Sequence, residues 1–441
     1  MNKKNILIIT HYFPPMNAIG SLRPYSWAKY WSRMGHDVTV LTTKKIKRSN
    51  DLNFDISEFK VIEVENIFRD NIKNKIGYQN DKHIINKNHK ITNLILIKLK
   101  TFFDSRGIIS FDARFPNLFD FWVKDALNVI KNEKFDIVVS TYPPYANHLI
   151  ALRYKKFNSS CFWVADYRDL WTQSHMFKGL FPFRLLEEYL ERKINTTANL
   201  ITTVSEPLAN QLKEKYGISN VEIIENGFDL EDVKNTPAEK IWGDNKVRLV
   251  YTGSLDTKTR DPSPLFEAIR QIYNSNYKHL LNNLEVIFIG GGKDNLDKLI
   301  LKYNVSKWVK HLGFLKREDS LRMQRDAHVV LFLEFEAENV DGILTGKLFE
   351  YLFSGTQIWG IGVTNKSAPG RLIEESGHGI NFGKDVNKIK EHLINLLKSK
   401  EKPKFDINIK LLEKYTREYQ AKKLLELIGK YRKNYINHSE L

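Results

Sequence analysis

Residues 5–28 read NILIITHYFPPMNAIGSLRPYSWA, an apolar run that is followed by His11, two prolines and the start of a helical pattern. The apolar run predicts a buried strand, which the prolines end. Gly20 allows the backbone to approach a ligand closely, Ser21 is placed to cap the helix, and Arg23 adds a cation to its first turn. Such a turn suits an anion or a sugar hydroxyl, because a helix N-terminus presents free N–H groups. An ordinary strand-to-helix turn is the competing interpretation.

Apolar runs of strand length recur along the chain with helical patterns between them, which predicts βαβ units and parallel sheets. They fall into two series: residues 5–10, 37–42, 59–64, 135–140, 161–166, 200–205 and 221–226, then 246–253, 284–292, 327–334 and 356–362. We therefore expect an α/β protein with two doubly wound, Rossmann-like domains that face each other across a ligand-binding cleft.

The polar stretch 230–246 has no periodicity and contains a proline, so it is expected to be a linker. It separates a first domain at 1–229 from a second domain at 247–410. The tail at 411–441 has helical spacing of its apolar residues, and we expect it to pack back on the first domain.

The composition points to an anionic partner, because the 441 residues carry a net charge of +16. A lysine-rich, solvated surface explains this charge equally well. No nucleic-acid motif accompanies it, so nucleic acid is not an expected partner. Cys161 is the single cysteine, which excludes an intrachain disulfide, and no apolar run has the length of a transmembrane helix. These features favour a cytoplasmic protein.

Two stretches of the second series resemble phosphate-binding turns. Gly253 ends a strand and precedes a loop with Lys258 and Arg260, two cations that suit a diphosphate but could equally be solvated. Residues 288–295, FIGGGKDN, repeat the pattern of a strand, glycines and a helix start.

A third stretch, GKLFEY (346–351), places Lys347 and Glu350 three residues apart on an expected helix, so that they share a face. Such a pair alone is usually a surface ion pair of little energetic value. Here it is expected to open toward the cleft.

The order and spacing of these motifs resembles the glycosyltransferase family 4 type of GT-B fold glycosyltransferases, many of which build bacterial surface polysaccharides. The resemblance spans nearly the whole chain and rests on HYFPPMNAIGSLRP (11–24), GHDVTVLT (35–42), FDIVVSTYPPYANHLIA (135–151), VADYRDLW (164–171), ITTVSEPLANQL (201–212), IENGFD (224–229) and GKLFEY. It implies a retaining enzyme that transfers a sugar from a UDP- or GDP-sugar to a glycan or lipid-linked glycan. The first domain would face the acceptor and the second would bind the nucleotide sugar.

The resemblance also implies roles for single residues. The donor is expected at Gly20, Ser21, Gly253, Lys347, Leu348 and Glu350, with the ribose on the Glu350 carboxylate. The catalytic residues are expected to be Asp166, Lys258 and Arg260, and the residues on the acceptor side His11, Arg23 and Arg168.

Two departures from the family pattern concern the donor. Many members carry a second Glu eight residues before the one at Glu350, where this chain has Gly342, although Glu338 and Asp341 are near. Ser254 follows Gly253 where an Arg is common. These departures leave the donor sugar open and keep an alternative, a non-catalytic protein that binds a sugar nucleotide or an anionic surface.

No metal or other cofactor is expected besides the nucleotide sugar, because the chain contains no Asp-x-Asp triplet and no Cys/His cluster. Residues 90–103, KITNLILIKLKTFF, form a basic amphipathic pattern, and MFKGLFPF (176–183) is a second apolar, basic stretch. Such a helix can lie on an anionic membrane, but a core-facing helix has the same pattern. Peripheral contact with the inner face of the cell membrane is thus one of two open interpretations.

Overall fold

The computed structural model describes residues 2–45, 51–65, 101–103, 105–108, 113–117, 120–174, 177–234, 237, 239–256, 260–333 and 344–439. Backbone contacts divide the chain into two compact units. The first unit comprises Met1–Arg48, Leu52–Ile224 and Ala421–Leu441, and the second comprises Ser49–Asp51 and Glu225–Gln420.

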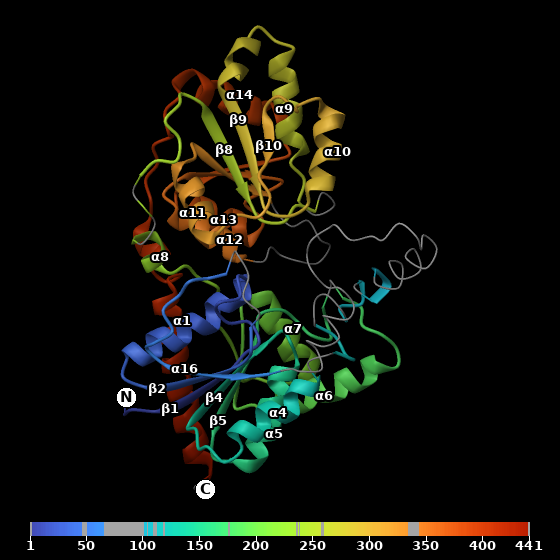
Figure 1. Cartoon of the computed structure of the whole chain (residues 1–441), viewed down its shortest axis with the longest axis vertical. Coiled ribbons are helices and arrows are strands. Elements are labelled where there is room, and N and C mark those ends of the chain that lie inside the picture. The colour runs from blue at the N-terminus through green and yellow to red at the C-terminus, as the bar shows by residue number, and fades with distance from the viewer. Residues whose placement is uncertain are drawn as a thin grey trace. The chain divides into compact units, whose positions relative to one another are not determined.

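The described part of the first unit holds a seven-stranded parallel sheet in the order β3-β2-β1-β4-β5-β6-β7 (Figure 1). Its strands are β1 (Asn5–Ile9), β2 (Asp37–Thr43), β3 (Lys60–Val64), β4 (Ile137–Tyr142), β5 (Phe162–Tyr167), β6 (Leu200–Thr203) and β7 (Val221–Ile223). Each corresponds to one of the predicted apolar runs, which are nearly continuous because helices cover both faces. The strand order reverses between β1 and β4, the place where folds of this kind bind ligands.

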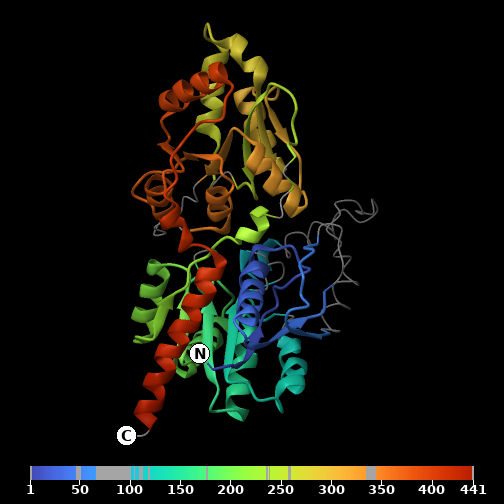
Figure 2. The same cartoon turned by 90° about the vertical axis from the view of Figure 1, so that its left-hand side faces the viewer.

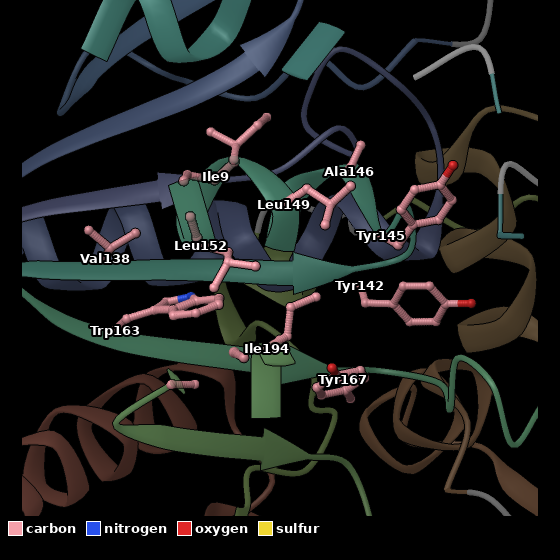
Figure 3. Packing of buried hydrophobic residues seen from close by; sticks show 14 of the residues in the cluster. Ile9, Val138, Tyr142, Tyr145, Ala146, Leu149, Leu152, Trp163, Tyr167 and Ile194 are labelled. Atoms are coloured by element: carbon pink, nitrogen blue, oxygen red, sulfur yellow. The ribbon is translucent and has the colours of Figure 1, made fainter. Parts of the chain in front are cut away.

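Helices cover the two faces of this sheet. One face packs against α4 (Asp120–Ile130), α5 (Ala146–Phe157), α6 (Phe183–Thr197) and α7 (Glu206–Tyr216), and Figure 3 shows part of that core. There, Leu152 of α5, Trp163 of β5 and Ile194 of α6 meet. The other face packs against α1 (Ile19–Arg33) and α16 (Arg417–Ser439).

The last helix returns to the first unit, as Figure 2 shows. Leu424 and Ile428 of α16 belong to the same buried cluster as Ile6 and Ile8 of β1. The Trp31 indole N–H also donates a hydrogen bond to the carbonyl of Ala421 at 2.9 Å. Apolar packing and this hydrogen bond together hold the helix against α1.

The described part of the second unit holds a six-stranded parallel sheet in the order β10-β9-β8-β11-β12-β13. The strands are β8 (Val247–Thr252), β9 (Leu284–Ile289), β10 (Val309–His311), β11 (Val329–Leu333), β12 (Gln357–Ile361) and β13 (Gly379–Gly383). One face packs against α9 (Ser263–Tyr273), α10 (Lys293–Tyr303), α14 (Val386–Ser399) and the 3₁₀ helix η1 (Lys278–Asn283). The other face packs against α11 (Arg317–Asp326), α12 (Gly346–Phe353), α13 (Ala368–Glu375) and α15 (Ile409–Glu413).

The expected fold class is confirmed, because both units are doubly wound α/β structures. Strands β10 and β13 were not predicted. The first has three residues, and the second, GINFG, contains two glycines, so neither forms an apolar run.

The boundary between the units lies at residues 224–225, earlier than the expected residue 229. Phe228 is buried in the core of the second unit and forms an isolated bridge with Thr416. The expected linker 230–246 also belongs to the second unit, where it forms α8 (Leu230–Lys234) and where the Ile241 N–H donates to Asp326 Oδ2 at 2.8 Å.

Two sequence predictions about membranes can be compared with the described residues. No helix there has both the length and the apolar character that crossing a membrane requires. The expected amphipathic helix at 90–103 lies outside the described residues, apart from residues 101–103.

Candidate active site

Asp166, near the end of β5, is fully buried and forms an ion pair with Arg23 of α1, which is 3% exposed. Arg23 Nη2 lies 2.7 Å from Oδ1, and Arg23 Nε lies 3.2 Å from Oδ2. The Thr141 hydroxyl donates to Oδ2 at 2.9 Å, and the Thr202 hydroxyl donates to Oδ1 at 2.8 Å. The two residues therefore tie α1 to β4, β5 and β6, and this geometry leaves neither of them on the surface for a sugar or an acceptor.

Arg168 follows β5 directly and carries a cation that is held by neutral groups. Its Nε and Nη2 donate to the carbonyls of Tyr142 at 3.1 Å and Pro143 at 2.8 Å, and its guanidinium lies 5.2 Å from the centre of the Tyr12 ring. Burial lowers the pKa of Arg168.

The N-terminal turn of α1 lies against this guanidinium. A Cβ on Gly20 would be only 2.0 Å from Arg168 Nη1, so glycine is what permits the close approach. Arg168 therefore presents a desolvated cation at a helix N-terminus, an arrangement that receives anions.

Ser21 and His11 are both buried beside this turn. The prediction that Ser21 caps α1 is wrong, because the helix begins earlier and Ala18 is its N-cap. The Ser21 hydroxyl, inside the first turn, has no hydrogen-bond partner within the described part of the chain. His11 Nδ1 lies 2.7 Å from the Thr43 hydroxyl, so its ring is anchored to β2.

In the second unit, Lys347 of α12 lies against the end of β8. Its Nζ is 2.8 Å from the Tyr251 hydroxyl and 4.0 Å from the centre of the Tyr251 ring. Gly253 has φ +123°, and a Cβ there would approach Lys347 Nζ to 2.9 Å. Burial lowers the pKa of Lys347 well below its usual value, and the nearby charge of Arg260 lowers it further.

Glu350, one turn further along α12, does not pair with Lys347. Arg317 Nη1 donates to Glu350 Oε1, and Arg317 Nη2 donates to Asp232 Oδ2 at 2.9 Å. Gln324 Nε2 lies 3.4 Å from Glu350 Oε2. Burial disfavours the Arg317 cation, but the two carboxylates outweigh that effect and raise its pKa. Sequence analysis missed Arg317 and Asp232, since a charged residue on a polar helix carries no distinguishing signal.

The three glycines at 290–292 serve close backbone packing. A Cβ on Gly290 would lie 2.4 Å from the Gly253 carbonyl oxygen, and a Cβ on Gly292 would lie 2.1 Å from that of Leu255. The Leu255 N–H donates to the carbonyl of Gly291 at 3.0 Å. The glycines thus bring the loop after β9 against the loop after β8, where Arg260 Nη1 donates to the Ser254 carbonyl at 3.2 Å.

The remaining predicted residues are either buried in the core or outside the described residues. The Leu348 side chain is fully buried in the apolar core, on the face of α12 that packs on the sheet. Lys258, Glu338, Asp341 and Gly342 lie outside the described residues. Within the described residues, no group of three or more His, Cys, Asp or Glu side chains is placed to hold a metal ion.

Comparison with known proteins supports the family resemblance. The model of Glycosyltransferase Family 4 matches residues 102–232. No curated protein sequence matches the chain. Solved structures align over almost the full length of both chains. One is a glycosyltransferase from Rickettsia africae, with 12% identity and a TM-score of 0.62 over 98% of this chain and 100% of that chain.

Two further structures have the same fold. Sucrose-phosphate synthase from Thermosynechococcus elongatus has 12% identity and a TM-score of 0.56, covering 99% of this chain and 98% of that chain. TarM from S. aureus, in complex with fondaparinux, alpha-GlcNAc-glycerol and UDP, has 13% identity and a TM-score of 0.53, covering 96% and 99%. The matched residues 102–232 and these structures make the chain similar to glycosyltransferases of family 4 and show that it has the GT-B fold.

The family match divides the candidate site residues into two groups. Asp166 and Arg168 lie within the matched residues 102–232, whereas Lys347, Glu350 and Arg317 lie in the second unit, beyond the match. Roles for the second group therefore rest on their own geometry.

Proposed function

We propose that this glycosyltransferase moves a sugar, with retention of its anomeric configuration, from a UDP- or GDP-linked donor to a glycan or lipid-linked glycan. The observation that carries the proposal is the environment of Lys347. Among the described residues its ammonium group has one hydrogen-bond partner, the neutral Tyr251 hydroxyl, although burial disfavours its charge. An anion bound at the end of β8 would replace the interactions with water that the Lys347 ammonium group loses on burial.

The donor diphosphate is the anion that fits this place best. Lys347 and Arg260 both lie near the loop after β8, and Lys347 is in the first turn of α12, at the positive end of the helix dipole. As the bond from the sugar to the diphosphate breaks, negative charge grows on the leaving group. Cations and helix N–H groups that are already in position stabilise that charge without reorganising. Glu350, oriented by Arg317, is the proposed acceptor of hydrogen bonds from the ribose.

Transfer is proposed to need no metal ion, since these cations can supply the neutralising charge. Turnover should therefore persist in EDTA and should not increase when manganese or magnesium is added. Activity that EDTA abolishes and manganese restores would overturn this part of the proposal. The proposed setting is surface polysaccharide synthesis at the cytoplasmic face of the cell membrane.

The donor assignment can be tested by thermal unfolding with UDP, GDP, ADP, CMP and their common sugar conjugates. A ligand that binds the folded chain raises the unfolding midpoint. We expect one nucleoside diphosphate to do so, and Lys347→Met to lower its affinity by about tenfold or more.

Lys278→Met is a matched control, because Lys278 Nζ lies 4.1 Å from the Tyr273 ring in a similar cation–π contact away from β8. It should leave the midpoint shift unchanged. No shift with any nucleotide, or an equal shift in Lys347→Met, would count against the proposal. Once a donor and an acceptor are known, NMR of the product establishes whether the configuration is retained.

A further inference from the structure

Helix α6 turns its acidic side chains inward. Glu187, Glu191 and Asn195 are spaced four residues apart on one face and are all buried. The Glu187 carboxylate accepts hydrogen bonds from Arg114 Nη2 at 2.7 Å and from the Trp171 indole N–H at 3.1 Å. The Arg114 and Glu187 side chains are 1% and 0% exposed, so this is a buried ion pair.

Glu191, one turn further along, is also held by hydrogen bonds. The Tyr216 hydroxyl donates to Glu191 Oε2 at 2.6 Å, and the Thr172 N–H donates to the same atom at 3.2 Å. These polar contacts share the inner face of α6 with Ile194, so little room is left there for the other apolar residues of the helix.

Apolar side chains consequently occupy the outer face of α6. Leu185, Leu186 and Tyr189 are 61%, 42% and 60% exposed, and Phe181, just before the helix, is 77% exposed. We call these four residues the α6 outer surface; α6 lies beside α5 and α7 in Figure 1. A surface helix normally presents the reverse pattern, and exposed apolar side chains that gather in one place mark an interaction site.

Cations lie close in sequence to the α6 outer surface. Lys178, Arg184 and Arg192 are exposed, and Lys193 Nζ lies 5.9 Å from the centre of the Tyr189 ring. Three acids are near in sequence, but the burial of Glu187 and Glu191 leaves only Glu188 toward the outside. The helix therefore presents apolar side chains within a positively charged rim.

We infer that the α6 outer surface docks this glycosyltransferase on an anionic lipid membrane. Aromatic and leucine side chains that enter the interface, with Lys and Arg at the level of the headgroups, are the pattern of peripheral membrane helices. A protein partner fits less well, because lysine is depleted in protein interfaces. The inference uses residues of the first unit alone and is independent of which donor is bound.

Vesicle flotation of the full-length chain tests the inference. The vesicles contain equal amounts of phosphatidylglycerol and phosphatidylcholine, or phosphatidylcholine alone. We expect flotation with the anionic vesicles only, and weaker binding at high salt. The double variant Leu185→Gln/Tyr189→Gln should bind at least about tenfold more weakly, since each buried apolar side chain contributes about that factor. Lys178→Gln should bind about fivefold more weakly, since one juxtamembrane cation contributes about 1 kcal/mol.

Leu301→Gln is the matched control, because Leu301 is 79% exposed on α10 of the second unit, and it should float as the wild type does. Thermal unfolding with nucleoside diphosphates is run on every variant, so that a defect of folding or of donor binding is distinguished from a defect of docking. Absence of wild-type flotation, or full flotation of the double variant, would overturn the inference. It would also be overturned by a concentration-dependent dimer that the double variant abolishes, which would make a second copy of the chain the partner.

Discussion

Arg317 Nη1 donates to the carboxylate of Glu350, while its Nη2 donates to Asp232 at 2.9 Å. The Arg317 and Glu350 side chains are 14% and 16% exposed, so their contact is poorly screened by water. A planar guanidinium with two anchored carboxylates sets the orientation of both. Arg317 is thus placed to hold the residue that we propose receives the donor ribose.

Arg317→Gln should weaken donor binding through Glu350. We expect the donor KM to rise about tenfold while kcat changes little, because the substitution loosens the Glu350 side chain without touching the diphosphate. The free energy of unfolding should fall by about 2 kcal/mol, the usual value of lost hydrogen bonds to charged groups. Steady-state kinetics and urea unfolding measure the two effects.

Two variants separate orientation from stability in this network. Asp232→Asn weakens the second contact of the Arg317 guanidinium, and it should lower the free energy of unfolding more than it raises the donor KM. Arg317→Lys keeps the positive charge but lacks the two separate donor groups of the guanidinium. Compared with Arg317→Gln, it should therefore recover more of the free energy of unfolding than of the donor KM. If Arg317→Gln lowers stability and leaves KM unchanged, Arg317 is a structural residue only.

Lys347 gives the unfolding equilibrium a distinct pH dependence. Its pKa in the folded chain lies well below the ordinary value of 10.5, first through burial and then through Arg260. Between the two pKa values the unfolded chain binds more protons, so the free energy of unfolding rises with pH across that window. Lys347→Met should remove this rise and stabilise the ligand-free chain on its acidic side, where the wild type buries a charge.

Nucleotide binding should have the opposite pH dependence, because a diphosphate binds the ammonium form of Lys347. Affinity for the nucleoside diphosphate should fall as pH rises through the depressed pKa, and Lys347→Met should flatten that fall. Calorimetric titrations over a series of pH values check both. Parallel pH profiles for the wild type and the variant would contradict a role for Lys347 in charge compensation.

The sheets could be predicted from sequence because buried parallel strands appear as apolar runs, as Val247–Thr252 illustrates. Partners in the site could not be predicted in that way. Lys347 and Glu350 are three residues apart, which suggests a mutual ion pair, but Tyr251 and Arg317 are nearer in space. Both partners come from other elements and are brought in by tertiary packing.

Burial of polar groups also escaped prediction. Asp166 and Arg168 are two residues apart in sequence, which suggests a shared role. In the structure, Asp166 is buried against α1, whereas backbone carbonyls hold Arg168 at the N-terminus of that helix. In α6, Glu187 and Glu191 occupy the inner face, although acidic residues are rarely buried. Hydrogen bonds and ion pairs to residues of other elements compensate for the burial in both cases.

Gly20→Ala should reduce activity without unfolding the chain. The added Cβ would lie 2.0 Å from Arg168 Nη1 and displace a guanidinium that two backbone carbonyls hold. We expect kcat/KM to fall about tenfold or more, since hydrogen bonds to a charged group are broken. The free energy of unfolding should fall by no more than about 2 kcal/mol, because the helix preference of alanine offsets part of the lost hydrogen bonding. Gly243→Ala is the control: no atom lies within 4 Å of its added Cβ, and activity should be unchanged.

Asp166→Asn distinguishes a structural from a catalytic role for the most buried of the predicted catalytic residues. The substitution removes the carboxylate of a buried ion pair, which should lower the free energy of unfolding by about 3 to 5 kcal/mol. Glu187→Gln removes the carboxylate of another fully buried pair, with Arg114, and should cause a similar loss. Activity per folded molecule, measured with urea unfolding on the same samples, should change no more in Asp166→Asn than in Glu187→Gln. If Asp166→Asn instead leaves the chain as stable as the wild type but slows turnover by orders of magnitude, the Asp166 carboxylate reaches the sugar.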